Sequence, residues 1–129
     1  MTCLDTTFLI DLQREMEAGR PGPAARWIRE NGEEEAGISA VAWGEFLEGF
    51  RDRSHPVLGE LAARFPVWPI GEEAAEVYGR VVRGLREQGR FIGSNDLWIA
   101  STALSRGIAL LTRNVEEMAR VPGLRVMGY

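Results

Sequence analysis

The chain begins with MTCLDTTFLIDL, residues 1–12, and this stretch decides the predicted fold. Its first four residues form a short apolar run that predicts a strand, and the polar tripeptide beginning at Asp5 ends that run. Phe8, Leu9 and Leu12 then recur at helical spacing, which predicts a helix. The stretch therefore predicts a strand, a tight turn and a helix, with an acid directly after the strand.

The rest of the chain alternates between the same two kinds of element. Further apolar runs predict strands at residues 36–38, 67–70, 108–111 and 124–127. Apolar spacing and turn residues predict helices at residues 24–31, 40–50, 57–65, 72–87, 95–107 and 115–120, with Ser39 and Ser94 as N-caps. We therefore expect one α/β domain over residues 1–129, with a central parallel sheet of four to five short strands between two layers of helices.

Composition excludes several classes of protein. The chain has 129 residues, including 15 Arg, no Lys and one Cys, and a formal net charge of −4. One Cys forms no internal disulfide, no signal segment opens the sequence, and no apolar run approaches the roughly 18 residues of a membrane span. We expect a cytoplasmic protein with no membrane contact. The absence of Lys excludes a Walker-A phosphate loop and Schiff-base chemistry. Because the pI is about 5.1, any contact with nucleic acid must be local.

Polar side chains follow the predicted strands at one edge of the sheet. Asp5 follows the first strand, and Asn114 follows the buried strand at residues 108–111. In open α/β sheets the functional crevice lies outside the carboxyl ends of the strands. Asp5 could equally be an N-cap. Asp96 begins a helix that is apolar on nearly all sides, so its carboxylate needs a cation or several hydrogen bonds. The cation would be an Arg partner or a divalent metal.

A third acid, Glu45, lies on the predicted helix that carries the aromatic stripe of Trp43, Phe46 and Phe50, on the side opposite this stripe. This position, taken alone, predicts that Glu45 is a surface residue. Hard divalent ions such as Mg²⁺ prefer carboxylate oxygens together with water, so three acids from different elements would suffice for a site. Such a metal supports phosphodiester hydrolysis.

Four segments resemble, in order and spacing, the signature segments of PIN domains, and in particular of the VapC ribonuclease toxins of bacterial toxin–antitoxin pairs. They are LDTTFLIDL (4–12), WGEFLEGF (43–50), IGSNDLWIASTAL (92–104) and LLTRNVEEM (110–118). The resemblance implies a three-layer PIN-like fold and an endoribonuclease that requires Mg²⁺, with Mn²⁺ able to substitute. It also implies a homodimer that is silenced by a cognate VapB-type antitoxin.

The resemblance also assigns roles to individual residues. Asp5, Glu45 and Asp96 match the three acids that hold the metal, and Thr7 matches the small polar residue that steadies the first of them. Asn114 completes the expected catalytic set at a place where many members carry a fourth acid. This departure argues against a tightly held second metal.

Supporting roles are less sharply defined by the sequence. Glu117 is either a solvated helix residue or reaches the pocket through water, and Asn95 either binds substrate or caps its helix. Candidate RNA contacts are Arg113 and an arc of arginines on and just after the long helix, namely Arg80, Arg83, Arg86 and Arg90. An ordinary salt-bridged surface is the other interpretation of that arc. The aromatic stripe is the expected anchor for the antitoxin.

Two other functions are alternatives to a metal-dependent ribonuclease. One is another Mg²⁺-dependent α/β phosphate hydrolase, of the receiver or haloacid-dehalogenase type. Both types normally use a Lys, which this chain lacks, and the haloacid-dehalogenase type also has an Asp at the position of Thr7. A non-catalytic PIN-like module that binds RNA or protein is expected to have lost its acids, and three remain. Both features favour the ribonuclease.

Overall fold

Five parallel strands form one sheet in the computed structural model, which describes residues 1–129, and their order is β3-β2-β1-β4-β5. The strands are β1 (Thr2–Leu4), β2 (Ala36–Ser39), β3 (Val67–Trp68), β4 (Ala109–Leu111) and β5 (Val126–Met127). The predicted parallel sheet of four to five short strands is therefore confirmed.

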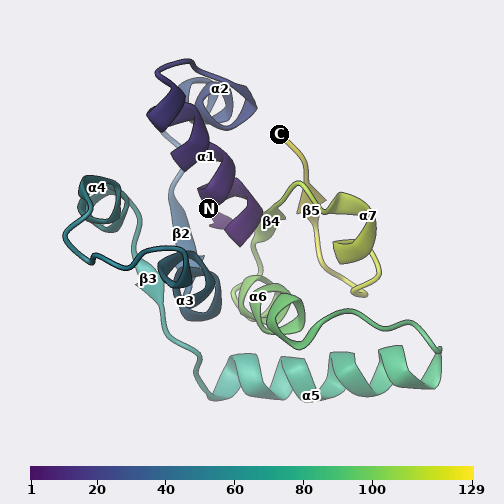
Figure 1. The fold of residues 1–129 in the computed structure, drawn as a ribbon. Coiled ribbons are helices and arrows are strands. Elements are labelled where there is room, and N and C mark those ends of the chain that lie inside the picture. The colour runs from purple at the N-terminus through teal and green to yellow at the C-terminus, as the bar shows by residue number, and fades with distance from the viewer.

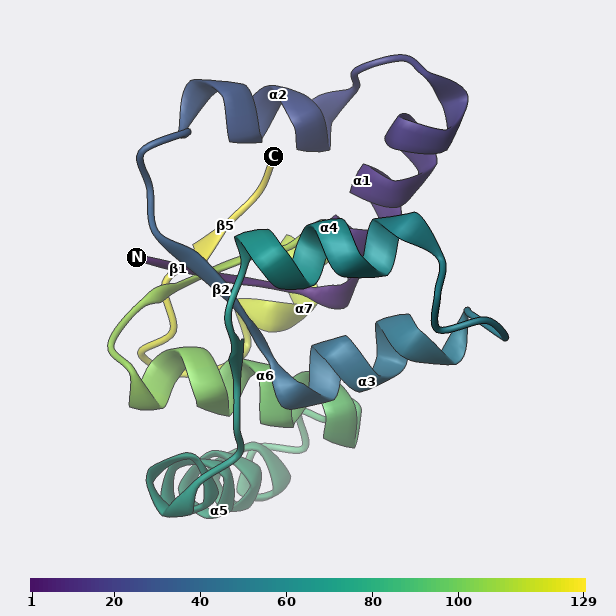
Figure 2. The same ribbon diagram turned by 90° about the vertical axis from the view of Figure 1, so that its left-hand side faces the viewer.

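Helices cover both faces of the sheet and complete the predicted three layers (Figure 1; Figure 2). They are α1 (Thr6–Ala18), α2 (Pro23–Glu30), α3 (Ala40–Glu48), α4 (Pro56–Arg64), α5 (Glu72–Glu87), α6 (Ser94–Ser105) and α7 (Val115–Met118). Figure 2 shows α1, α2 and α4 on one side of the sheet and α3, α6 and α5 on the other, with α5 separated from the strands by α6. None of these helices combines the length and the apolar character needed to cross a bilayer.

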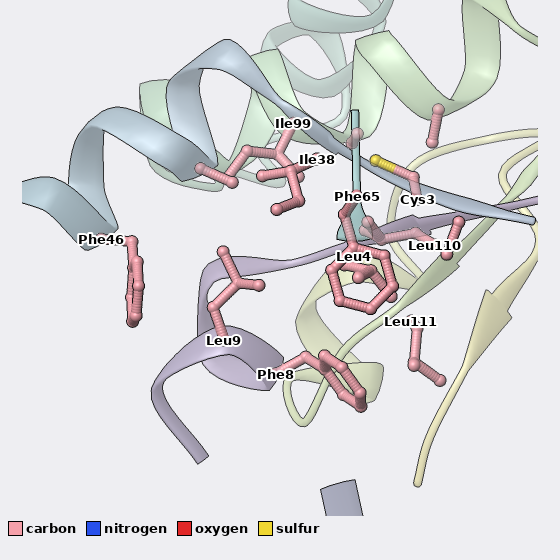
Figure 3. Packing of buried hydrophobic residues seen from close by; sticks show 14 of the residues in the cluster. Cys3, Leu4, Phe8, Leu9, Ile38, Phe46, Phe65, Ile99, Leu110 and Leu111 are labelled. Atoms are coloured by element: carbon pink, nitrogen blue, oxygen red, sulfur yellow. The ribbon is translucent and has the colours of Figure 1, made fainter. Parts of the chain in front are cut away.

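The central strand β1 is buried on both faces, which explains its nearly continuous apolar sequence. Leu4 is in register with Ile38 of β2 and with Leu111 of β4, and all three side chains are fully buried. Figure 3 shows these residues packed together with Phe8 and other core side chains. This packing fixes where β1 ends, and so fixes the position of the residue that follows it.

The chain reverses its direction across the sheet at β1. From β1 it proceeds to β2 and β3 on one side, and later returns to β4 and β5 on the other. In parallel sheets a crevice forms outside the carboxyl ends of the two strands at such a reversal. Residues directly after β1 and β4 therefore lie side by side at the place, called the crevice from here on, where such a site is expected.

Some predicted boundaries need correction. Asp5 is the N-cap of α1, so this helix begins at Thr6 and includes the threonines that the sequence assigned to a turn. Ser94 is the first residue of α6 and not its N-cap, a position that Gly93 occupies without a side-chain bond. Ser39 is confirmed as the N-cap of α3, because its hydroxyl accepts a hydrogen bond from the Ala42 N–H at 3.2 Å. The edge strands β3 and β5 have two residues each, shorter than predicted, because each pairs with only one neighbour.

Trp68 of β3 lies against the backbone of β2 at a position where only glycine leaves enough room. A Cβ atom added at Gly37 would be 2.4 Å from the indole ring of Trp68. The Arg106 guanidinium lies over the same ring, 4.2 Å from its centroid. The indole is therefore held between the backbone of β2 and a cation, which fixes the edge of the sheet.

We expect Gly37→Ala to lower the free energy of unfolding by about 1–3 kcal/mol, because the added methyl group forces Trp68 to move. The matched control is Gly79→Ala in α5, where the added methyl meets nothing within 4 Å and the helix gains about 0.5–1 kcal/mol. Urea denaturation of both variants measures the difference. Equal stability of the two variants would contradict the packing of Trp68 on Gly37.

Candidate active site

The carboxylate of Asp5 is buried at the carboxyl end of β1, with only 2% of the residue exposed. Its backbone N–H donates to the Leu111 carbonyl at 3.0 Å, which ties it to the end of β4. One carboxylate oxygen accepts from the Thr6 N–H at 2.8 Å, and the other accepts from the Thr112 hydroxyl at 2.6 Å and the Thr7 hydroxyl at 3.2 Å. Three donors from two elements therefore fix its orientation.

Burial nevertheless raises the pKa of Asp5 above its ordinary value, although the hydrogen bonds from Thr112, Thr6 and Thr7 oppose that rise. The negative charge of Glu45 raises the pKa further. The expected role of Thr7 in steadying this acid is thus matched by a direct contact. The N-cap interpretation of Asp5 is confirmed, and its role in a functional site stays a prediction.

Glu45 of α3 is half-buried and is linked to both neighbouring elements of the crevice. Oε1 accepts from the Thr6 hydroxyl at 2.7 Å, and Oε2 accepts from the Asn95 amide at 3.2 Å. The interpretation of Glu45 as a surface residue is therefore wrong. Asn95 does not cap its helix, since Gly93 holds that position, and it holds Glu45 in place.

Asp96 occupies the first turn of α6, is half-buried, and has no hydrogen-bond or ion-pair partner in the structure. Its surroundings raise its pKa to about 6, chiefly through burial and then through the negative charges of Asp5, Glu117 and Glu45. The sequence left an Arg partner or a metal open for this carboxylate, and no Arg pairs with it. A bound cation would offset the burial and the repulsion between negative charges at Asp96.

Asn114 and Glu117 lie on the opposite wall of the crevice from α3. Asn114 is the N-cap of α7, and its side-chain amide donates to Glu117 Oε2 at 3.1 Å. Its backbone N–H donates to the Thr112 hydroxyl at 2.9 Å, the same hydroxyl that binds Asp5. Glu117 is half-buried, and its negative charge contributes to the raised pKa of Asp96, so it lies near the acid cluster.

The acid cluster, defined as Asp5, Glu45, Asp96 and Glu117, offers only oxygen donors, which suit Mg²⁺ or Mn²⁺. However, no group of three or more His, Cys, Asp or Glu side chains is arranged to ligate one metal ion. This differs from the three converging ligands predicted from the sequence. The reason is visible in the contacts, because Asp5 and Glu45 are each turned toward protein donors while Asp96 is bound by none.

The candidate RNA-binding arginines lie in three places. Arg80, Arg83 and Arg86 are exposed on α5, on the far side of α6 from the strands, and Arg83 pairs with Glu87 (Figure 1). Arg90 is exposed in the segment between α5 and α6. Arg113 follows Thr112 directly and lies at the crevice. Among these candidates, Arg113 is tied to the acid cluster by hydrogen bonds through Thr7. Arg86 and Arg90 line a hollow with Ser94 and Leu97 at the start of α6.

The aromatic stripe of α3 is not the exposed surface that the sequence suggested. Phe46 is 2% exposed and packs at 5.1 Å from Phe50 and 5.9 Å from Trp43, measured between ring centroids. Trp43 and Phe50 are half-buried. Phe46 is therefore part of the core, and the larger hollows of the surface lie elsewhere.

Sequence reasoning missed four residues that complete the crevice. They are Thr6 and Thr112, which bind Glu45 and Asp5, together with Asp11, which contacts Arg113, and Tyr129, which donates to Asp11. The available signal was position, because Thr112 and Thr6 directly follow strand ends or their caps. No local signal places Tyr129 beside Asp11, since 118 positions separate them.

Known proteins are similar to this chain in sequence and in fold. The PIN domain family matches residues 2–124. Ribonuclease VapC1 of Rickettsia felis is 40% identical over 132 residues, which span 96% of this chain and 92% of that protein. The solved structure of VapBC-1 from nontypeable Haemophilus influenzae matches with a TM-score of 0.83 and 29% identity, over 98% of this chain and 96% of that one. VapBC2 of Rickettsia felis, solved on a promoter DNA fragment, has a TM-score of 0.86 at 22% identity, over 99% and 98% of the two chains.

These matches extend over nearly the whole chain, and they agree with the four sequence segments and with the order of the strands. The chain belongs to the PIN-domain family, within its group of VapC proteins.

Proposed function

We propose that this protein is a metal-dependent endoribonuclease that acts in the cytoplasm as the toxin of a toxin–antitoxin pair. The observation that carries this proposal is the grouping, at one end of the sheet, of the acid that follows β1 with acids of α3 and α6, with Asp96 lacking any protein partner. The relative from Rickettsia felis is named a ribonuclease, which supports the same activity. A non-catalytic module has no need to keep these like charges together.

The donor set fits Mg²⁺, with Mn²⁺ able to replace it. Mg²⁺ usually takes one or two protein carboxylates and keeps several waters, so a preassembled trio of ligands is not required. Asp5 and Asp96 would hold the ion, and Glu45 would complete the anionic set. When bound, such an ion polarises a phosphoryl oxygen and lowers the pKa of a bound water.

The chain's own residues prepare the site. Thr112, Thr7 and the Thr6 N–H orient the Asp5 carboxylate, so it need not reorganise when charge develops on a phosphate. The Thr6 hydroxyl and Asn95 hold Glu45. Asn114 adds no negative charge and links Glu117 to Thr112, which fits a site for one strongly bound ion.

We propose that a VapB-type antitoxin is the partner of this chain. The Haemophilus influenzae structure, 29% identical to this chain, is of a VapBC protein. An apolar groove between α1, α2 and α4 offers a docking surface away from the acid cluster, with a volume of about 370 Å³; its lining includes Met16, Ala25, Ile28 and Leu61. Met16 is 43% exposed. The homodimer implied by the family resemblance stays a prediction, which sedimentation of the purified chain would test.

We expect Asp5→Asn, Glu45→Gln and Asp96→Asn each to reduce RNA cleavage about 10²-fold or more, because each change removes a charge while nearly preserving shape. Cleavage of a labelled RNA in Mg²⁺ and in EDTA measures the effect. Glu116→Gln, a change at an exposed residue of α7 outside the cluster, is the matched control and should retain activity. Full activity of Asp96→Asn, or of the native chain in excess EDTA, would refute the metal mechanism.

The raised pKa of Asp96, about 6, predicts a pH-dependent stability in the absence of metal. The folded state binds this proton more tightly than the unfolded state, whose pKa is near the ordinary 3.8. Ionisation of Asp96 therefore destabilises the folded protein as pH rises from about 4 to about 6. We expect Asp96→Asn to have the same melting temperature as the native chain at pH 4. At pH 7.5 its free energy of unfolding should be higher by about 1 kcal/mol, a value reduced because Asp96 is partly exposed to solvent.

Asp52→Asn is the control of opposite sign for this pH experiment. The N–H and hydroxyl of Ser54 lower the pKa of Asp52, so its ionised form stabilises the fold above its titration range. This variant should be no more stable than the native chain at pH 7.5. Thermal melts in EDTA at both pH values measure all three proteins, and an Asp96→Asn advantage that does not change with pH would contradict the environment described for Asp96.

A change within the apolar groove should weaken binding of the partner. We expect Met16→Glu to release the small partner protein when the tagged chain is purified from its native host, because it introduces a charge into the groove. Ala62→Glu, on an exposed position of α4, is the matched control and should keep the partner bound. Recovery of the native chain alone and fully active would refute the antitoxin partner, and retention by both variants would refute this docking surface.

A further inference from the structure

A cluster of three polar side chains lies beside the acid cluster and is not explained by metal binding. The Arg113 guanidinium contacts Asp11 Oδ1 through Nη1 at 2.6 Å. The Tyr129 hydroxyl donates to Asp11 Oδ2 at 2.7 Å. Asp11 therefore accepts hydrogen bonds from both neighbours, one on each oxygen, and joins α1 to two segments from the other end of the chain.

This cluster is linked to the catalytic carboxylate through the backbone. The Arg113 N–H donates to the Thr7 hydroxyl at 3.1 Å, and that hydroxyl donates to Asp5 at 3.2 Å. Thr112, the residue before Arg113, binds Asp5 at 2.6 Å. The backbone of Arg113 is therefore held by the same threonines that orient Asp5.

The Arg113 guanidinium is held by Asp11 and still has donors free for a ligand. The side chain of Arg113 is 57% exposed, whereas that of Asp11 is 18% exposed. One of the five guanidinium N–H donors is used by Asp11, so donors remain for a further ligand. An ion pair this exposed contributes little to stability, so stability alone gives little reason for the arrangement.

Tyr129 is fixed independently of its hydroxyl. Its ring packs edge to face on Phe8, with 5.0 Å between the centroids, and Phe8 is fully buried. Burial and the hydrogen bond to Asp11 raise the pKa of Tyr129 above its ordinary range, so its hydroxyl stays a donor at neutral pH. A rigid donor thus occupies one oxygen of Asp11 and leaves the other to Arg113.

We propose that Arg113 binds a phosphate of the RNA strand next to the acid cluster, and that Asp11 and Tyr129 are positioning residues that fix its guanidinium for this contact. This inference rests on the proposed ribonuclease activity and assigns part of its substrate site. A planar, pre-oriented guanidinium is suited to binding phosphate through paired hydrogen bonds. An acidic protein needs such a local cation where the RNA approaches like charges.

Binding of a labelled single-stranded RNA, measured across a salt series, tests the phosphate contact. All variants are made in the Asp96→Asn background, where cleavage is suppressed. We expect Arg113→Gln to weaken binding about tenfold and to reduce the slope of log affinity against log salt by about 0.7, the value for one phosphate contact on a single strand. Arg113→Lys should restore the slope without restoring the full affinity, because it keeps the charge and loses the planar fork.

A double-mutant cycle tests the positioning role. We expect Tyr129→Phe, which removes only the hydroxyl, to weaken binding about threefold with an unchanged salt slope, and to have no further effect when Arg113 is already Gln. Tyr78→Phe, on α5, is the matched control and should bind RNA like the parent. Additive losses from Tyr129→Phe and Arg113→Gln would overturn the positioning role, because Tyr129 would then act independently of Arg113.

Two outcomes distinguish this inference from the function on which it rests. If the native chain cleaves RNA but Arg113→Gln keeps the affinity and salt slope of the parent, the phosphate contact is overturned and the ribonuclease stands. If the native chain neither binds nor cleaves RNA, both are overturned. Near-ultraviolet circular dichroism of each variant identifies any loss of binding that results from unfolding. If Arg113→Gln is unfolded, Arg113→Lys serves in its place. Full parental RNA affinity of Arg113→Lys would then overturn the phosphate contact.

Discussion

The buried carboxylate of Asp5 is the feature on which the rest of the site depends. A carboxylate taken out of water destabilises the fold unless hydrogen bonds replace its hydration. Here the donors come from the first turn of α1 and from the residue after β4. The three donors are available together only because β1 and β4 are adjacent and parallel, with their carboxyl ends at the same edge.

The same edge brings together charges that repel one another. Asp5, Glu45 and Glu117 all raise the pKa of Asp96, and no side chain compensates it. A fold selected for stability alone would place a cation or a neutral residue there. The metal-free protein is thus less stable than its core would allow, and a bound cation would convert this repulsion into binding affinity.

The core supplies the rigidity that this arrangement requires. Leu4, Ile38 and Leu111 lie in register across the three central strands and are fully buried, so the ends of these strands cannot shift independently. Among the candidate site residues, Asp5 directly follows β1, Glu45 lies in the second turn of the helix that follows β2, and Asp96 lies in the first turn of α6. The hydrophobic packing is therefore the support that determines where the acids point, while the threonines refine their orientation.

The sequence by itself determined the alternation of strands and helices, the parallel sheet and the acids that follow it. These features depend on local periodicity and on strand ends, which are properties of neighbouring residues. It placed Ser94 wrongly as a helix cap and Glu45 wrongly at the surface when taken alone, because helical periodicity gives the direction of a side chain but not the element that faces it.

Only the tertiary structure decided which side chains meet. The contact of Glu45 with Thr6 and Asn95 and the contact of Tyr129 with Asp11 each depend on how distant elements pack. Such contacts have no signature within a short window of sequence, since their partners are 39 to 118 positions apart. The burial of the sheet, and not the local order of residues, brings them together.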